Sequence, residues 1–100
     1  MARRLLLRPR ARDDLNRIYD FIADFAGAAS AARITAQIEA HCRKLLAWPR
    51  RGTPHPELRE ELRTVPCGKA VIAYLVDGQV IDVVRIRYGG QLLRPEDVAD

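Results

Sequence analysis

Lys69–Arg87, KAVIAYLVDGQVIDVVRIR, is the most informative part of this chain for its fold. Two apolar runs rich in β-branched residues flank Asp77-Gly78, and Asp-Gly in this setting is typical of a β-hairpin with a two-residue turn. The runs, Lys69 to Val76 and Val80 to Arg87, are apolar on both faces over much of their length. Both are therefore predicted to be central strands of a sheet.

A third strand is predicted just before this hairpin. Glu60 to Pro66 has strand character, and Pro66-Cys67-Gly68 supplies a turn after it. Upstream, Pro49 to Glu57 is rich in proline and is the only long connection, so it is predicted to be a loop. The segment from Glu60 to Gln91 is thus predicted to be a three-stranded antiparallel meander.

A short strand and two helices are predicted ahead of the sheet. Arg4 to Arg8 is apolar at its centre and is closed by Pro9, which fits the first turn of a helix. Gly27 is predicted to end that helix as a left-handed cap. The second helix is predicted to start at Ser30, unless Ala28–Ala32 extends it backward, and to stop at Trp48-Pro49. Apolar residues recur at helical spacing: Ala11, Leu15, Ile18, Ile22 and Phe25 in the first helix, and Ile34, Ile38, Cys42 and Leu45 in the second.

The predicted fold class is α+β, with a short N-terminal strand, an antiparallel two-helix hairpin and a three-stranded antiparallel meander that forms one sheet covered by the helices. One hundred residues are expected to make a single domain, residues 1–100. The longest apolar run, Ala70 to Val76, is far shorter than the roughly 20 residues that span a bilayer. The basic N-terminus is followed by only a short apolar run, Leu5–Leu7, so a signal peptide is not expected. A cytoplasmic location without a membrane partner is the expectation.

The sequence holds no recognisable catalytic or metal-binding motif, and no cofactor is expected. Cys42 and Cys67 have no thiol or histidine at ligand spacing and are predicted to be free, buried or half-buried thiols. His41 and His55 have no obvious orienting partner, which a general base requires. Solvation explains the carboxylates predicted on the outer face of the first helix, namely Asp13, Asp14, Asp20 and Asp24.

Positive charge is the most distinctive property of the composition. The net charge is +4, and all but two of the 17 cations, Lys44 and Lys69, are arginine. Arginine matches carboxylate and phosphate groups through two parallel hydrogen bonds, although an arginine-biased genome would give the same composition. The clustering of these cations along the chain favours an acidic partner, either protein or nucleic acid. Direct nucleic-acid binding is the weaker alternative, because aromatic residues make up only 6% of the chain and leave little for base stacking.

The candidate binding residues are cations around the end of the last strand. Arg85 and Arg87 share one face of that strand, and Tyr88 adds a ring beside them. Such a set could anchor acidic side chains of a partner protein or stabilise a strained phosphate during RNA cleavage. Alternatively, Arg85 pairs internally with Asp82 or with a helix carboxylate. The full candidate set is Arg10, Arg12, Arg63, Lys69, Arg85, Arg87 and Tyr88.

The chain resembles the ParE toxins of bacterial type II toxin–antitoxin systems, within the larger RelE/ParE superfamily. The resemblance covers nearly the whole length and depends on the order and spacing of short pieces. These include Ala11-Arg12-Asp13-Asp14-Leu15, Gly27 with Ala31-Ala32, Glu57-Leu58-Arg59, Ile72-Ala73-Tyr74 and Val83-Val84-Arg85-Ile86 leading to Tyr88-Gly89-Gly90-Gln91.

The resemblance implies a toxin of the kind used in plasmid stabilisation. It implies a cognate ParD-like antitoxin, with a DNA-binding N-terminal domain and a C-terminal segment that wraps the toxin in a hetero-oligomer. It also implies inhibition of DNA gyrase by binding, so the chain is not expected to be an enzyme. The candidate residues would meet the antitoxin or the target.

Two alternatives stay open. A RelE-type toxin would cut messenger RNA on the ribosome, but RelE-type nucleases carry basic residues just after the last strand and a terminal helix with a catalytic tyrosine. This chain has Gly89-Gly90-Gln91 there, and Leu92 to Asp100 contains no aromatic residue. Leu92 also stands where some ParE relatives carry an acid. The other alternative is a non-toxic interaction module of the same fold.

Overall fold

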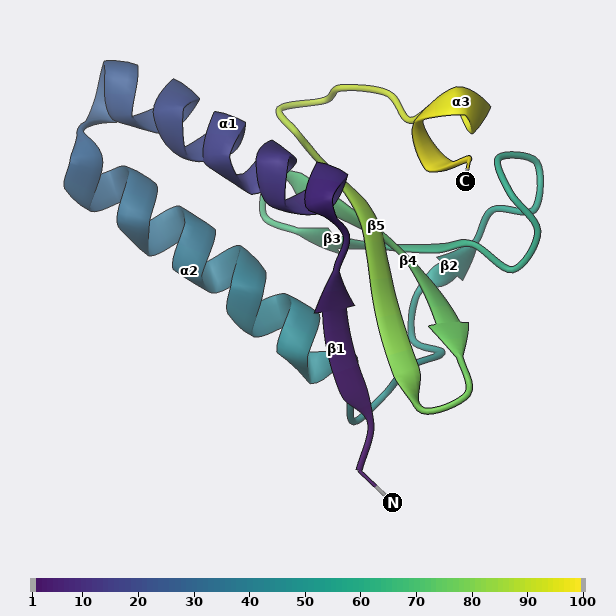
Figure 1. The fold of residues 1–100 in the computed structure, drawn as a ribbon. Coiled ribbons are helices and arrows are strands. Elements are labelled where there is room, and N and C mark those ends of the chain that lie inside the picture. Colours follow the sequence, from purple (N-terminus) through teal and green to yellow (C-terminus); the bar gives the residue numbers. More distant parts are fainter. Residues whose placement is uncertain (1, 100) are drawn as a thin grey trace.

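The computed structural model describes residues 2–99, which form an α+β fold with a five-stranded mixed sheet (Figure 1). The strand order is β1-β5-β4-β3-β2, with β1 parallel to β5 and the other neighbours antiparallel. In chain order the elements are β1 Arg4–Leu7, α1 Pro9–Ala26, α2 Ala28–Lys44, β2 Thr53–Pro54, β3 Arg63–Cys67, β4 Ala70–Asp77, β5 Val80–Tyr88 and α3 Pro95–Val98.

The predicted meander corresponds to β3, β4 and β5, but the sheet is larger than predicted. Asp77 pairs with Val80, so the two loop residues are Gly78 and Gln79, one position later than expected. The short strand β2 lies within the predicted loop and pairs with β3. The third predicted strand begins at Arg63 and not at Glu60, because the chain is still turning at Glu61, whose φ is 66°.

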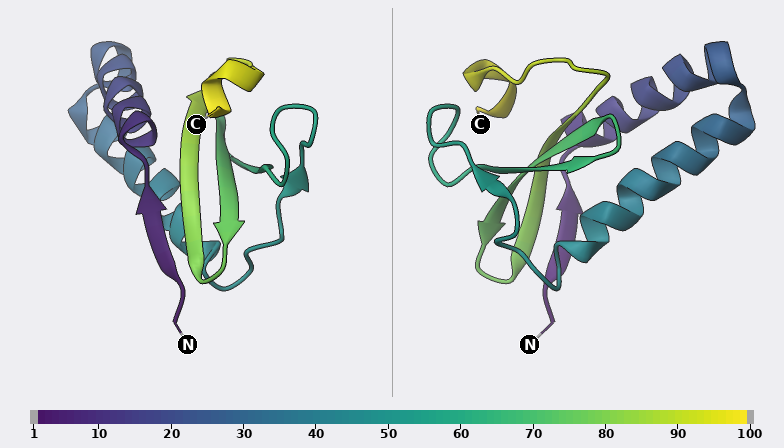
Figure 2. Two further views of the ribbon diagram at one scale, coloured as in Figure 1. Left: turned by 45° about the vertical axis from the view of Figure 1, so that its right-hand side comes forward. Right: turned by 180° about the vertical axis from the view of Figure 1, so that it is seen from behind.

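Helices α1 and α2 form the predicted hairpin, joined by a single residue. Gly27 has φ 92° and ψ 160°, a backbone conformation that is essentially restricted to glycine. Because α2 already begins at Ala28, the backward extension is the correct alternative and Ser30 is not its N-cap. The two helices lie together on one side of the sheet, and α3 lies on the other side (Figure 2).

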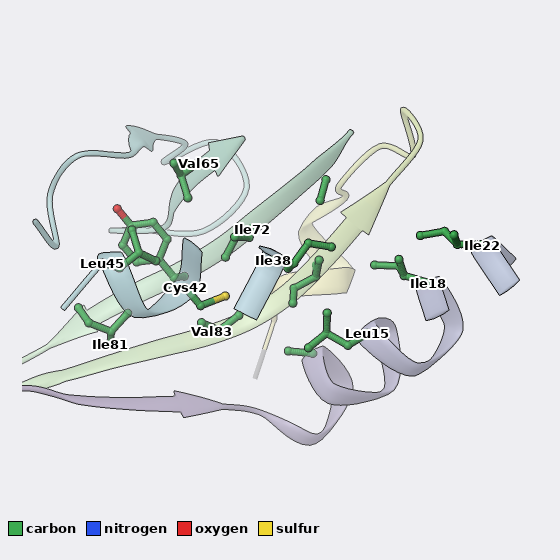
Figure 3. Close-up of a cluster of buried hydrophobic side chains, with 14 of the residues drawn as sticks. Leu15, Ile18, Ile22, Ile38, Cys42, Leu45, Val65, Ile72, Ile81 and Val83 are labelled. Carbon is green, nitrogen blue, oxygen red and sulfur yellow. The ribbon is translucent and has the colours of Figure 1, made fainter. Parts of the chain in front are cut away.

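The main core fills the space between the helical hairpin and the sheet (Figure 3). Leu15, Ile18 and Ile22 of α1 pack there with Ile38 and Cys42 of α2 and with side chains of the sheet. A smaller apolar cluster covers the opposite face of the sheet and contains Leu62, Ala73, Val84 and Val98. The sheet is therefore buried on both faces.

Phe25 departs from the predicted apolar stripe of the first helix. Its side chain is 68% exposed, although its spacing matches that of the core residues before it. Phe25 is exposed because it is the second-to-last residue of α1, which ends at Ala26. The end of this helix extends past the edge of the sheet (Figure 1). Within residues 2–99, no helix has both the length and the apolar character that a membrane crossing requires.

Candidate functional site

A buried ion pair joins α1 to the last strand. The Arg85 guanidinium donates from Nε and Nη2 to the two carboxylate oxygens of Asp14, at 2.8 and 2.9 Å. Asp14 is 4% exposed and Arg85 8%. The prediction that Asp14 lies on the solvated face of the helix is therefore wrong. Of the two internal partners considered for Arg85, the helix carboxylate is the one observed, since Asp82 pairs with Arg8 at 2.8 Å.

The position of Asp14 follows from an open backbone edge. Strand β1 pairs with β5 only as far as Val83, so the rest of β5 has no neighbouring strand on that side. Helix α1 covers this edge, and the Asp14 carboxylate accepts a 2.9 Å hydrogen bond from the Ile86 backbone N–H. A carboxylate that accepts hydrogen bonds from both a guanidinium and the backbone can remain charged when it is buried.

A β-bulge sets the direction of both arginines. Ala73 pairs with Arg85 and Tyr74 pairs with Val83, so Val84 is an extra residue in β5. Without it, strict alternation would place Arg85 on the same face as Val83, in the main core. The bulge instead places Ile86 in that core and turns both Arg85 and Arg87 toward Asp14 and Asp97.

Arg87 connects the strand to the C-terminal helix. Its Nη2 lies 2.8 Å from the Asp97 carboxylate, and its Nη1 lies 3.9 Å from Asp14. The hydrogen bond from Arg87 holds the pKa of Asp97 below its usual value. Arg87 Nε is buried and has no hydrogen-bond partner among residues 2–99. Both predicted arginines thus form ion pairs within the protein, with Asp14 and Asp97. Their role in partner binding stays a prediction.

An exposed aromatic cluster lies next to these arginines. Phe21 is 58% exposed, and its ring centroid lies 5.2 Å from that of Phe25 and 6.4 Å from that of Tyr88, in edge-to-face geometry. Two concavities of about 350 and 390 Å³ flank Tyr88. The side chains around them are apolar or basic for the most part. We name this surface the Tyr88 groove, and its defining residues are Arg17, Phe21, Phe25, Arg33, Ile34, Lys69, Arg87 and Tyr88.

The structure brings together only some of the predicted residues. Lys69, Arg87 and Tyr88 line the groove. Arg10 and Arg12 are exposed at the start of α1, outside the lining of both concavities. Arg63 is half-buried, and its guanidinium donates to the backbone oxygens of Arg50 and Gly52 at 3.1 and 2.8 Å.

Sequence reasoning missed the aromatic residues and two cations of α1 and α2. Phe21 and Phe25 are four residues apart on a helix, a spacing that places two side chains on one face. That pair was the available signal, but Phe25 also matched the core stripe and was assigned to it. Arg17 and Arg33 gave no signal of their own among so many arginines.

His41, His55 and Cys42 lie outside both concavities of the groove, whereas the Cys67 thiol, whose pKa is raised by burial, lines the second one. Burial raises the pKa of the Cys42 thiol to about 12, which keeps it protonated. His55 contacts Glu57 at 2.9 Å in the loop after β2. Within the part of the chain that the structure describes, no three histidine, cysteine or acidic side chains are grouped as a metal site would require. The groove offers apolar surface bordered by cations, which suits an amphipathic, partly acidic segment.

Comparison with known families gives one match that covers most of the chain. Residues 5–93 match the family described as "ParE toxin of type II toxin-antitoxin system, parDE". Toxin ParE1 of Mycobacterium tuberculosis strain H37Rv is 32% identical over 87 residues, which cover 86% of this chain and 89% of that protein. The same protein of strain CDC 1551 is equally similar.

The solved structures that share the fold include two from toxin–antitoxin systems. One is described as the chromosomal ParDE TA system from P. aeruginosa, with a TM-score of 0.76 and 22% identity, over 88% of this chain and 96% of that chain. The other is the toxin–antitoxin complex RelBE2 from Mycobacterium tuberculosis, with a TM-score of 0.68 and 19% identity, over 89% of this chain and 100% of that chain.

Proposed function

The chain belongs to the ParE toxin family of type II toxin–antitoxin systems, and on that basis we propose that a cognate, ParD-like antitoxin neutralises it by laying a C-terminal segment into the Tyr88 groove. The observation that carries this proposal is the exposure of Phe21 and Phe25 beside Tyr88. Large aromatic side chains that remain exposed together mark a surface that a partner covers.

The charges around the groove define the antitoxin segment. Arg17, Arg33 and Lys69 are exposed around the groove. An amphipathic segment would cover the rings with apolar residues and place carboxylates against these cations. Ordering such a segment costs about 2–5 kcal/mol, so the apolar contacts must exceed that cost.

The target we propose is DNA gyrase, inhibited by binding and without bond breaking by the toxin itself. A toxin that breaks no bond itself fits the arrangement of the arginines on the last strand. Arg85 and Arg87 are engaged with Asp14 and Asp97, so they are not positioned to hold a strained phosphate. The C-terminal helix α3, Pro95–Val98, carries no tyrosine. The likeness to a RelBE complex keeps a ribosome-dependent endoribonuclease as the second candidate.

Controlled expression of the chain, alone and together with its antitoxin, tests this proposal. We expect the toxin alone to stop growth, the antitoxin to restore it, and purified gyrase to accumulate cleaved DNA when toxin is added. The matched control is the same gyrase assay with the preformed toxin–antitoxin complex, which should not trap breaks. Cut messenger RNA without DNA breaks would favour the endoribonuclease, and harmless expression would indicate a non-toxic interaction module.

A further inference from the structure

A second exposed surface lies at the far end of the helical hairpin from the Tyr88 groove. Trp48 follows α2 and is 64% exposed. It lines a concavity of about 630 Å³ together with Arg3, Pro49, Arg50 and Arg51. We name these five residues the Trp48 surface. Helix α2 has 17 residues, so about 25 Å of helix separates its two ends (Figure 1).

The backbone that presents Trp48 is firmly anchored. The Tyr74 hydroxyl donates to the Pro49 carbonyl at 2.8 Å and accepts from the Gly52 backbone N–H at 3.0 Å. The Arg63 guanidinium donates to the carbonyls of Arg50 and Gly52. Trp48 therefore projects from a rigid loop, and a partner would bind it without first ordering the chain.

The charged side chains that line the concavity beside Trp48 are Arg3, Arg50 and Arg51, and all three are basic. The segment from Ala40 to Pro56 contains Arg43, Lys44, Arg50 and Arg51 and no acidic residue. Burial lowers the pKa of nearby His41, and the positive charges of Arg51 and Lys44 lower it further. The local potential is therefore positive, and it favours a negatively charged partner.

The residue types favour an acidic protein over a nucleic acid. Tryptophan and arginine are the residues most enriched where a few side chains carry most of the binding energy of a protein interface. Single-stranded nucleic acids instead stack successive bases on several aromatic rings. Trp48 is the only tryptophan in the chain, and no other aromatic residue lines this concavity.

We propose that the Trp48 surface docks an acidic surface of the toxin's protein target, and that it is separate from the Tyr88 groove that takes the antitoxin. The proposal rests on the proposed function, because it assumes that this toxin acts by binding a target. It assigns the two partners to opposite ends of the hairpin, so changes at Trp48 should alter toxicity without altering antitoxin affinity.

The test compares disruptive and conservative variants of this surface. Trp48→Ala and the pair Arg50→Glu with Arg51→Glu should reduce growth arrest by about tenfold or more. Their affinity for a peptide of the antitoxin's C-terminal segment should stay within about twofold of wild type, because the groove is unchanged. Trp48→Phe and the pair Arg50→Lys with Arg51→Lys should retain most toxicity. Leu92→Ala, which removes another exposed apolar side chain (80% exposed), is the matched control.

The possible outcomes separate this inference from the proposed function. Full toxicity of Trp48→Ala, or parallel loss of toxicity and peptide binding, would overturn the inference alone. A harmless wild-type chain would overturn the proposed function and this inference with it. Fluorescence of the single tryptophan gives a second readout with short single-stranded and duplex DNA as probes. We expect no change at physiological salt, and saturable quenching would assign the surface to nucleic acid instead.

Discussion

Asp14 and Arg85 show how a buried charge can be required without being a source of net stability. Asp14 accepts three hydrogen bonds, two from Arg85 and one from the Ile86 N–H, so its desolvation is compensated. Apolar residues of similar volume could stabilise the fold equally well. What the pair provides is a fixed connection between α1 and the open edge of β5, next to the Tyr88 groove.

Removing one member of this pair should be costly. Arg85→Ala leaves the Asp14 carboxylate buried with only the Ile86 N–H and the distant Arg87 as partners. We expect the free energy of unfolding to fall by about 3–5 kcal/mol, measured by urea denaturation followed by circular dichroism. Arg10→Ala, an exposed arginine on the same helix, should change it by less than about 0.5 kcal/mol. A similar small effect for both variants would show that the pair is not structurally required.

Gly52 is a site where the absence of a side chain is required by close packing. A Cβ at this position would lie 2.6 Å from the Tyr74 hydroxyl and 2.8 Å from the Thr64 carbonyl oxygen. Gly52→Ala should therefore destabilise the protein by about 1–3 kcal/mol through overpacking. Adding Tyr74→Phe should relieve only part of the strain, because the Thr64 backbone remains. Thermal unfolding of the three proteins checks this, and a fully stable Gly52→Ala would mean that the loop can shift.

The end of helix α1 belongs to the groove and not to the core, which can be tested separately from stability. Phe25→Ala removes a ring that is 68% exposed, so the free energy of unfolding should change by less than about 0.5 kcal/mol. Affinity for the antitoxin's C-terminal peptide should fall by about tenfold or more, measured by calorimetry. Leu92→Ala, which removes a side chain that is 80% exposed and lies outside the groove, should leave the affinity unchanged. Unaltered binding by Phe25→Ala would place the antitoxin elsewhere.

The attachment of helix α3 should depend on pH through Asp97. Arg87 lowers the pKa of Asp97 in the folded protein below its usual value of 3.8. A lowered folded-state pKa means that the stabilisation is fully present above the unfolded pKa and is lost as pH falls through the folded one. Amides of Pro95–Val98 should therefore lose hydrogen-exchange protection below about pH 4. Asp97→Asn should show weaker protection at neutral pH and less dependence on acid, and an unchanged acid response would exclude this carboxylate.

The sequence predicted elements well where one local signal had one meaning. The Asp77-Gly78 dipeptide located the β4–β5 hairpin to within one residue, and helical spacing located α1 and α2. It failed where the outcome depends on distant neighbours. From the sequence alone Asp14 is expected to be exposed, because nothing there shows that β1 ends opposite Val83 and leaves the rest of β5 as an open edge for α1 to cover. The groove formed by Phe21, Phe25 and Tyr88 requires knowledge of how far α1 extends past the sheet.

The same limit applies to the arginines. Sequence alternation placed Arg85 and Arg87 on one face, and the structure agrees, since both reach Asp14. The bulge at Val84 determines which face of the sheet they share, and this bulge cannot be recognised from the residue pattern. The binding roles predicted for Arg10, Arg12 and Arg63 stay predictions, because only a complex with a partner would show them.

At the scale of the whole molecule, the sheet has a cover on each face. The helical hairpin lies on one face and α3 on the other (Figure 2). On the α3 side, Leu62 and Val98 pack with Ala73 and Val84 of the sheet. Val98 is 0% exposed, and Arg59 donates a 2.7 Å hydrogen bond to its carbonyl. The C-terminal segment is therefore part of the fold and closes the second layer of a small domain.

Truncation after Gln91 tests this two-sided arrangement. It uncovers Ala73 and Val84 and removes the Asp97 partner of Arg87, while every residue of the Tyr88 groove is kept. Loss of the Val98 side chain alone should lower the free energy of unfolding by roughly 1.5–3 kcal/mol, and the uncovered strands should promote aggregation on heating. Glu96→Gln, an exposed change in the same helix, is the control. If the truncated chain melts at the wild-type temperature, the single helix-covered layer suffices for folding and α3 serves only a partner.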